Sequence, residues 1–363
     1  MSNALDPLVI GDLEIKVPIV QGGMGVRVST APLAAAVADC GAAGTIASVG
    51  LGYGVEENET NFPKASREGL EREMRHAREL TDGIVGVNIM MALSNYADLV
   101  ETTVREKADF IISGAGLPLK LPALVEGSDI KLIPIASSAR AAAIIMKTWR
   151  KRYSRVPDGI VVEGPLAGGH LGFRPDDLLP HGDKENTLEQ LVAEIVEVAE
   201  EYGAAGRPIP VIAAGGVFDG KDIARFLKIG ASGVQMATRF VATNECTVAD
   251  EFKQLYLAAE EGDLVIVPSP VGMPGRAIRT EFIVRVMQGE RIPYKCSYRC
   301  LIPCDPNTAP YCIAKALFRA VSGDVENAIV FAGSEVTRVK KIVPVKELID
   351  EVVDEALAEL ATA

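Results

Sequence analysis

Short, uninterrupted apolar runs recur eight times along this chain of 363 residues, and most of them end in a small, glycine-rich turn. Such runs are typical of parallel strands that are buried on both faces, because neither face then needs polar side chains. We therefore predict eight strands. They are Val17–Val20, Gly44–Ser48, Ile84–Ile89, Phe110–Ser113, Lys131–Ala136, Val161–Glu163, Pro210–Ala214 and Gly233–Met236.

The segments between these runs carry the start signals of helices. Thr187 is followed three residues later by Gln190, which is the pattern of a capping box, and Asp219 is followed in the same way by Asp222. Thr30 is placed to cap the first helix. The predicted helices are Ala31–Asp39, Ser66–Leu80, Tyr96–Lys107, Leu121–Glu126, Ala139–Arg152, two that begin after Thr187 and after Asp219, and Asp250–Glu261.

Eight strands that alternate with eight helices predict an α/β fold, a (β/α)8 TIM barrel, with a doubly wound open sheet as the competing arrangement. A barrel of this kind takes about 250 residues. We expect residues 1–263 to form it and residues 264–363 to be an appended segment packed on the barrel. The appended segment contains a cysteine-rich stretch and ends in an amphipathic helix, Val345–Leu360.

The charge balance excludes some classes of partner. Lys and Arg number 37 against 49 Asp and Glu, a net charge of −12, which argues against nucleic-acid binding. An anionic ligand stays possible, because backbone N–H groups hold phosphate without a basic surface. The N-terminal residues lack the basic and apolar regions of a signal peptide. Glycines interrupt the longest charge-free apolar stretch, Cys40–Val55, so we expect no membrane span and a cytoplasmic protein.

The turns at the strand ends suit a broad, flat ligand. In a (β/α)8 barrel, chemistry lies on the loops after the carboxyl ends of the strands, and glycine lets the backbone approach a ligand closely. The turns after strands seven and eight are where barrels commonly hold phosphate. The alternative is that glycine only punctuates these turns. The turns are Gln21–Met24, Asn88, Ser113–Gly116, Glu163–His170, Gly215–Gly216 and Ala237–Thr238.

His170 stands at the mouth of the turn after the sixth strand and is one of three histidines in the chain. Its side chain can move a proton near neutral pH, so it is our candidate acid/base; a turn histidine bonded to the backbone is the alternative. We expect His76 and His181 to be solvated. Glu163 either contacts a ligand or cation or lies at a solvated rim.

Four of the six cysteines lie close together in the sequence, at Cys296, Cys300, Cys304 and Cys312. Their spacing lacks the paired CxxC units of common metal motifs, so we assign no metal ligand. Reduced structural thiols, a zinc or iron–sulfur site and a reversible redox role stay open. The segment Ser269–Arg279 is read as a loop, which either covers the site or is a surface connection.

Five motifs resemble, in chain order, those of nitronate monooxygenases (formerly 2-nitropropane dioxygenases). The same pattern is similar to that of flavin-dependent enoyl-ACP reductase II. The resemblance extends from Pro18 to Arg285, and it is more specific for a flavin-binding fold than for a substrate. The motifs are Gln21–Gly25, Gly86–Asn88, Ala167–His170, Ala213–Gly216 and Gln235–Phe240.

The resemblance implies FMN at the open end of the barrel, near a catalytic His170. Gly22, Gly23, Met24 and Asn88 would lie near the isoalloxazine ring. The turns after strands seven and eight would hold the phosphate. The predicted cofactor-binding residues are Gln21, Gly22, Gly23, Met24, Asn88, Glu163, Gly168, Gly169, Gly215, Gly216, Gln235, Met236, Ala237 and Thr238.

Two positions depart from the nitronate monooxygenase pattern. Ala237 stands where that family usually has glycine, and the extra methyl group narrows the approach of a phosphate. The stretch Glu163–Leu166 stands where nitronate monooxygenases more often have Gln-Gly, and its glutamate is closer to the reductase pattern.

The resemblance implies an FMN-dependent oxidoreductase that oxidises alkyl nitronates with O2 to carbonyl compounds and nitrite. One alternative is an NAD(P)H-dependent flavin reductase that acts on an enoyl thioester or a quinone, and NAD(P)H would then be a second partner. Another is a metal- or redox-sensing protein built on the cysteines. A catalytic cysteine is not expected, because none stands in a strand-end turn. Homodimer formation stays open.

Overall fold

The computed structural model describes residues 4–53, 61–178, 187–203 and 208–362. Its centre is one sheet of eight strands in the order β3-β11-β10-β8-β7-β6-β5-β4, with every pair parallel. The sheet closes where Val20 in β3 pairs with Ala43 next to β4, so the predicted barrel is confirmed. The strands are β3 (Ile19–Gln21), β4 (Gly44–Ala47), β5 (Val85–Met90), β6 (Phe110–Gly114), β7 (Lys131–Ala136), β8 (Ile160–Glu163), β10 (Val211–Ala214) and β11 (Gly233–Met236).

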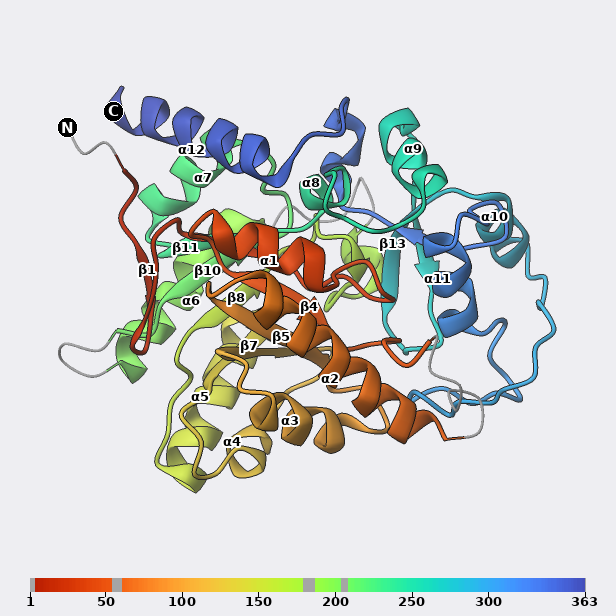
Figure 1. Ribbon diagram of the computed structural model, residues 1–363, viewed down its shortest axis with the longest axis horizontal. Helices are drawn as coiled ribbons and strands as arrows, with labels where there is room; N and C mark the ends of the chain where they lie inside the picture. The colour runs from red at the N-terminus through yellow and green to blue at the C-terminus, as the bar shows by residue number, and fades with distance from the viewer. Residues whose placement is uncertain (1–3, 54–60, 179–186, 204–207, 363) are drawn as a thin grey trace.

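Helices surround this barrel (Figure 1). Both predicted capping boxes are present, at Thr187 with Gln190 and at Asp219 with Asp222. The second helix begins at Phe62 rather than Ser66, because the Asn61 side chain caps it. The helices are α1 (Ala31–Asp39), α2 (Phe62–Leu80), α3 (Tyr96–Arg105), α4 (Leu121–Leu124), α5 (Ala139–Tyr153), α6 (Leu188–Tyr202), α7 (Gly220–Ile229), α8 (Thr238–Val241) and α9 (Asp250–Ala258).

A short hairpin fills the amino-terminal end of the barrel. Its antiparallel strands are β1 (Leu8–Ile10) and β2 (Leu13–Ile15). Leu8, Ile10 and Ile15 are fully buried among side chains from inside the barrel, such as Phe110 and Ile212. This floor was not predicted. Since it blocks one end of the barrel, a ligand must enter at the carboxyl ends of the strands.

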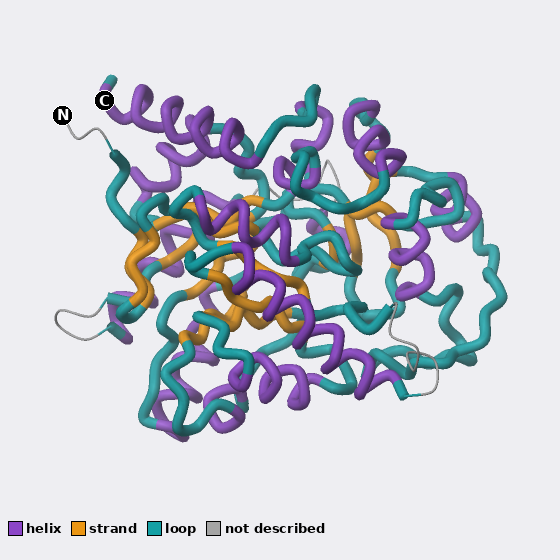
Figure 2. The backbone as a smooth tube through the Cα atoms, viewed as in Figure 1, coloured by secondary structure: helices purple, strands orange, loops and turns teal. Residues whose placement is uncertain are grey.

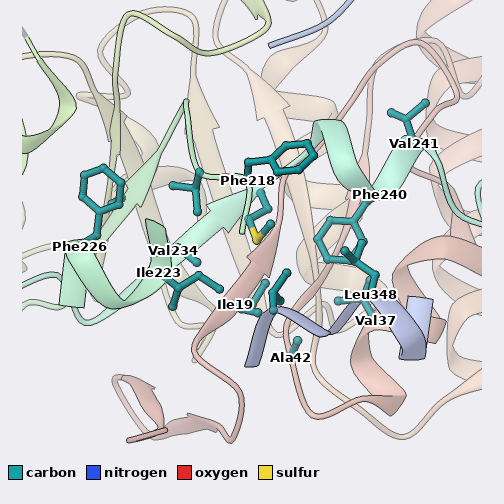
Figure 3. Packing of buried hydrophobic residues seen from close by; sticks show 14 of the residues in the cluster. Ile19, Val37, Ala42, Phe218, Ile223, Phe226, Val234, Phe240, Val241 and Leu348 are labelled. Carbon is teal, nitrogen blue, oxygen red and sulfur yellow. The ribbon is translucent and has the colours of Figure 1, made fainter. Parts of the chain in front are cut away.

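The outer core lies between the barrel strands and the helices around them (Figure 3). Ile19 and Val234 face helical residues that include Phe226 and Phe240, and all four are buried. The final helix α12 (Val345–Ala361) adds Leu348 to the same cluster. No helix in the described ranges is both long and apolar enough to cross a bilayer.

The segment after α9 builds a second, smaller sheet, which Figure 2 shows beside the barrel. Its strands are β12 (Leu264–Pro268), β13 (Pro274–Ile278), β14 (Val330–Phe331) and β9 (Gly169–His170), all antiparallel. The reading of 269–279 as a loop was wrong, since half of it is strand β13. Helices α10 (Glu281–Met287) and α11 (Ile313–Val321) flank this sheet, and we call residues 264–344 together with β9 the cap. A boundary between barrel and cap near residue 263 is our proposal.

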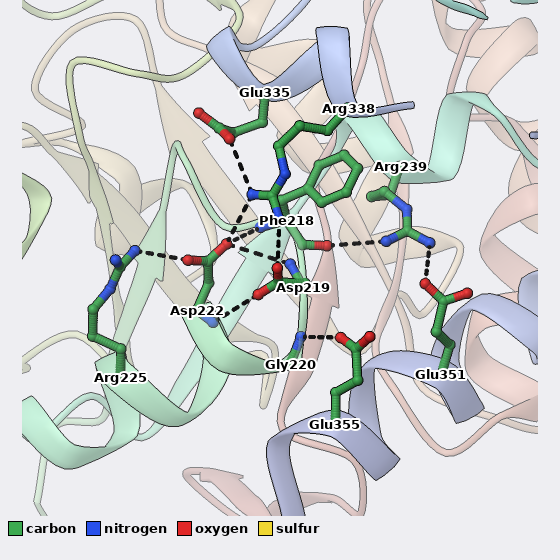
Figure 4. Close-up of polar contacts among 10 residues, drawn as sticks. All are labelled: Phe218, Asp219, Gly220, Asp222, Arg225, Arg239, Glu335, Arg338, Glu351 and Glu355. Carbon is green, nitrogen blue, oxygen red and sulfur yellow. Dashed lines mark hydrogen bonds and ion pairs between the residues drawn. The ribbon is translucent and has the colours of Figure 1, made fainter. Parts of the chain in front are cut away.

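The end of the chain is fastened to the barrel by ion pairs and backbone contacts (Figure 4). Arg239 donates to the Phe218 carbonyl at 3.3 Å and to Glu351 in α12 at 2.9 Å. Glu355 accepts the backbone N–H of Gly220 at 3.0 Å. These contacts fix α12 beside α7, just behind the turns after strands β10 and β11.

We expect Gly220→Ala to destabilise the fold by about 1–3 kcal/mol, the usual cost of overpacking. A Cβ at this position would lie 2.3 Å from the backbone nitrogen of Ala356 and 2.4 Å from the Val352 carbonyl oxygen. Neither backbone atom can move without shifting α12 from α7. Urea unfolding measures the effect, with the exposed neighbour Lys221→Ala as control. Equal midpoints for the two variants would contradict this packing.

Candidate active site

A cavity of about 390 Å³ lies at the carboxyl ends of the barrel strands. Its lining combines the strand-end turns with residues of the cap, such as Met273, Leu301 and Phe331. This volume falls in the range of small-molecule and cofactor sites. The site therefore lies where barrel chemistry is expected, under a cover that comes from the last third of the chain.

The structure gathers all but one of the predicted site residues around this cavity. The lining includes the turn after β3, Asn88 in β5, the turn after β8, and the turns after β10 and β11. The predicted residues found there are Gly22, Gly23, Met24, Asn88, Glu163, Gly168, Gly169, His170, Gly215, Gly216, Gln235, Met236, Ala237 and Thr238.

Gln21 is the exception, because its side chain does not line the cavity. It is fully buried, and both ends of its amide are engaged by protein. Its nitrogen donates to Ser29 Oγ at 2.7 Å, and its oxygen accepts the Thr45 N–H at 3.0 Å. Gln21 thus holds β3 against its neighbours and fixes the start of the turn at Gly22.

Close packing between turns explains why glycine is needed at two strand ends. A Cβ at Gly23 would lie 2.3 Å from the Cβ of Asn88, so only glycine leaves room for that side chain. Gly215 has φ +88°, which side-chain-bearing residues rarely adopt. A Cβ at Gly215 would also lie 2.9 Å from Ala167. The turns after β8 and β10 therefore form one continuous wall.

Pairing between the barrel and the cap positions His170. The residue lies in β9, opposite Gly275 of β13. Its Nε2 and the Ser269 Oγ are 2.8 Å apart, and Phe331 packs edge-on against the ring with centroids 5.0 Å apart. Burial lowers the pKa of His170 to about 4. The imidazole is therefore neutral at physiological pH and available as a base.

Glu163, the last residue of β8, faces the same cavity. Burial raises the pKa of its carboxyl to about 7. Its side chain makes no hydrogen bond or ion pair within the part of the chain that the structure describes. A carboxyl with this pKa can take up or release a proton near neutral pH. The pKa values of His170 and Glu163 are thus shifted in opposite directions by the same cause, which is desolvation.

We expect Glu163→Gln to stabilise the ligand-free protein at pH 8 but much less at pH 5. The folded-state pKa lies above the ordinary value, so the neutral carboxyl is favoured on folding and this stability is lost as the pH rises through 7. At about 1.4 kcal/mol per pKa unit, the difference is on the order of 2–3 kcal/mol. Urea unfolding at both pH values measures it. The exposed Glu79→Gln is the control, and a pH-independent difference would contradict the assignment.

Arg276 holds a turn of the site from behind, a role that the sequence did not reveal. Its guanidinium is buried, and Nη1 donates to the carbonyl oxygens of Pro165 and Ala167 at 2.6 Å each. It lies in β13, more than a hundred residues after the turn that it holds. No local pattern marks this role, because the pairing of β13 with β9 creates it.

A second turn from the cap reaches the predicted phosphate position. The backbone N–H of Gly333 donates to Thr238 Oγ1 at 3.2 Å, and the Ser334 N–H donates to the Leu166 carbonyl at 3.0 Å. Gly333 and Ser334 both line the cavity. The apolar run Ala328–Ala332 followed by Gly-Ser had the form of another strand and turn, and this signal could have located them.

The cavity has little positive charge. Its described lining includes no lysine or arginine, and its ionisable groups with resolved shifts include Glu163 and His170. Apolar side chains such as Val26, Met90 and Leu317 line much of the rest. An anionic substrate would therefore depend on backbone N–H groups and neutral donors.

The cysteines of the cap are all free and partly buried. Cys300 lines the cavity, although no cysteine was expected there. Within the described ranges, no group of three or more His, Cys, Asp or Glu residues is arranged to hold a single metal ion. His76 is exposed in α2, as expected, and His181 lies outside the described residues.

Comparison with known proteins agrees with this geometry. The model of the family described as nitronate monooxygenase matches residues 6–104 and 94–355, which is nearly the whole chain. The chain belongs to the nitronate monooxygenase family. A probable nitronate monooxygenase of Staphylococcus aureus (strain Newman) is 27% identical over 316 residues, covering 77% of this chain and 79% of the relative.

Other relatives carry names that describe different reactions. A (3aS,4S,5R,7aS)-5-hydroxy-7a-methyl-1-oxo-octahydro-1H-indene-4-carboxyl-CoA dehydrogenase of Mycobacterium tuberculosis is 31% identical over 277 residues, 76% of this chain and 67% of the relative. For the protein of the same name from Rhodococcus jostii, the match covers 64% of the relative. The chain thus spans about two thirds of these two proteins. The solved structure of FabK from Thermotoga maritima has a TM-score of 0.73 at 28% identity, covering 95% of this chain and 94% of FabK.

Proposed function

We propose that this family member is an FMN-dependent oxidoreductase of nitronate monooxygenase type. It would oxidise an alkyl nitronate, or the parent nitroalkane, with O2 to a carbonyl compound and nitrite. The observation that carries the proposal is that His170, which desolvation keeps neutral, lines a cavity walled by glycine turns. Membership of the nitronate monooxygenase family supports oxidoreductase chemistry.

The residues present fit a flavin. Gly22, Gly23 and Asn88 leave a flat wall for a ring system, and Gln235 Oε1 is buried without a hydrogen-bond partner among the described residues. That orphaned acceptor would be satisfied by a donor on the cofactor. When bound, FMN supplies the electron transfer between substrate and O2.

The phosphate of FMN would lie against the turns after β10 and β11, as is common in barrels. Backbone N–H groups of Gly215 and Gly216 and the hydroxyl of Thr238 are the donors that we propose. Gly333 and Ser334 of the cap border the same position. Ala237 also lines the cavity, and a Cβ added at Gly22 would lie 3.1 Å from its methyl group.

His170 would accept a proton from the substrate carbon, as a general base. Ser269 Oγ lies 2.8 Å from Nε2 of His170 and accepts the backbone N–H of Val271 at 3.2 Å. In the proposed tautomer Nε2–H would donate to Ser269 Oγ, which would leave Nδ1 with a lone pair for the proton.

A second candidate is an oxidoreductase of thioester substrates, with or without NAD(P)H. The absence of lysine and arginine from the described lining favours a neutral, apolar substrate over a nitronate anion. The carboxyl-CoA dehydrogenase of Mycobacterium tuberculosis supports the same candidate. In that reaction Glu163 or His170 would remove the acidic proton next to the thioester carbonyl.

Anaerobic reduction of the purified holoprotein separates these candidates. Bleaching of the flavin spectrum by propyl-2-nitronate alone, followed by nitrite formation when O2 is admitted, supports the first. Bleaching by NADH or NADPH alone, or by a saturated acyl-CoA alone, supports the second. A protein without flavin after FMN is added back would overturn both.

A further inference from the structure

Arg276 is a buried cation without an acidic partner among the described residues. It is 7% exposed, and Nη1 makes its side-chain hydrogen bonds, to the carbonyl oxygens of Pro165 and Ala167 at 2.6 Å each. Burial lowers the pKa of Arg276, but an arginine stays charged in a protein. The buried Glu163 does not balance this charge, since burial is the sole cause of its raised pKa. A buried charge without a partner is costly, so we expect an anion from outside the chain.

The hydrogen bonds of Arg276 aim two backbone donors in the opposite direction. The peptide groups 165–166 and 167–168 are trans, and in a trans peptide group the carbonyl and the following N–H point opposite ways. Both carbonyls point to Nη1, so the N–H groups of Leu166 and Gly168 point away from it. Neither N–H donates a hydrogen bond within the part of the chain that the structure describes. Leu166 and Gly168 both line the cavity, whereas Arg276 lies behind them.

These backbone donors share one corner of the cavity with Thr238. A Cβ added at Gly333 would lie 3.0 Å from Thr238 Oγ1 and 3.6 Å from the Gly168 nitrogen. Thr238 Oγ1 accepts the Gly333 N–H at 3.2 Å, which leaves the hydroxyl hydrogen for a ligand. The turn after β10 borders the same corner, because a Cβ added at Gly216 would lie 3.2 Å from the Leu166 Cβ. The donors therefore surround the place where we put the phosphate.

A phosphate monoester is the anion that this arrangement suits. It presents three acceptor oxygens and carries nearly two negative charges at neutral pH. Backbone N–H groups that point the same way form concavities that bind such anions. A hydrogen bond from a cation to a carbonyl also polarises the N–H of the same peptide group. Arg276 therefore strengthens both backbone donors without contacting the ligand.

We propose that Arg276 is a positioning residue for the phosphate of FMN. It acts through the peptide groups 165–166 and 167–168, whose N–H groups bind the phosphate together with the Thr238 hydroxyl. This inference rests on the proposed function, because the proposed flavin supplies the phosphate. One hydrogen bond, the width of a peptide group and a second hydrogen bond place the guanidinium roughly 7–8 Å from the phosphate. The two charges still attract each other strongly, because protein rather than water lies between them.

Riboflavin, which is FMN without its phosphate, separates this role from a purely structural one. We expect Arg276→Met to raise the Kd for FMN roughly 10–30-fold, the effect of two unit charges about 7–8 Å apart at an effective dielectric constant of about 20. The Kd for riboflavin should stay unchanged. Arg276→Lys keeps the charge and should recover most of the FMN affinity. Arg279→Met, which removes an exposed arginine just after β13, should change neither Kd. Fluorescence titration of the apoproteins measures these constants.

A measurement on the wild-type holoprotein does not depend on the folding of any variant. The second pKa of a phosphate monoester is about 6. Backbone donors with a cation behind them favour the doubly charged form and so lower this pKa. The ³¹P chemical shift of bound FMN should therefore stay constant from pH 8 to pH 5, while that of free FMN titrates over the same range.

Two results would overturn the role of Arg276. They are equal losses of FMN and riboflavin affinity in Arg276→Met, and a ³¹P signal of bound FMN that titrates with the pKa of free FMN. A wild-type protein that binds neither flavin would instead overturn the proposed function. Inorganic phosphate then tests the anion site, because it should raise the Tm of the wild-type apoprotein but not that of Arg276→Met. No rise in the wild type would overturn the anion site as well.

Discussion

Replacing His170 by Asn is expected to lower kcat/KM by about 10²–10⁴, the usual contribution of a general base. Desolvation lowers the pKa of His170 to about 4, and its Nε2 lies 2.8 Å from Ser269 Oγ, so the neutral imidazole can take a proton without first losing one. Asparagine keeps polar atoms in the turn but cannot accept the proton. Steady-state kinetics with nitroalkane and with preformed nitronate measure the loss.

The two substrates make this test specific to proton transfer. A preformed nitronate has already lost its acidic proton, so the loss should be larger with the neutral nitroalkane. Flavin content should stay unchanged. His76→Asn, which alters an exposed histidine of α2, should behave as wild type. Equal losses with both substrates would assign His170 to substrate orientation instead.

Gly215→Ala is expected to weaken flavin binding by about 10–100-fold. An added Cβ would lie 2.9 Å from Ala167 and 3.0 Å from the Gly164 carbonyl oxygen, and it must adopt φ +88°. The turn has to move, and losing one charge-assisted hydrogen bond to phosphate costs about 1.5–3 kcal/mol. Fluorescence titration of the apoprotein with FMN measures the change in Kd.

A matched control separates backbone strain from contact with the ligand. Gly289 has nearly the same φ, +87°, but an added Cβ there would meet nothing within 4 Å. Both substitutions should cost about 1–2 kcal/mol of stability, as left-handed residues do. Only Gly215→Ala should lose flavin affinity. Similar FMN affinities in the two variants would contradict our placement of the phosphate at this turn.

Local signals in the sequence were enough to predict the barrel. The fifth predicted strand, Lys131–Ala136, and the first helix, Ala31–Asp39, have the observed bounds. Both are defined by nearby residues: an apolar run in one case, and Pro32 in the first turn in the other. The hairpin of β1 and β2 was missed because its strands are only three residues long and Glu14 interrupts the apolar pattern of β2.

The residues of the candidate site also fall into two groups, those that local sequence signals predicted and those that only long-range pairing places. Its glycine turns follow directly from strand ends, so the sequence located them. Gly333 lines the cavity, while Ser269 and Arg276 contact the turn after β8 that lines it, and only long-range pairing brings these three residues there. Gln21 shows the converse error, because its place in a motif did not reveal that Ser29 and Thr45 occupy its side chain.

The pairing of β9 with β13 has a consequence for anyone who wishes to engineer this enzyme. His170, the proposed proton acceptor, lies on a strand of the cap, in register with Gly275. A chain cut at the end of the barrel would keep His170 yet lose the partner that aims it. Exchanging the cap for that of a relative would consequently change the orientation of His170 together with the choice of substrate.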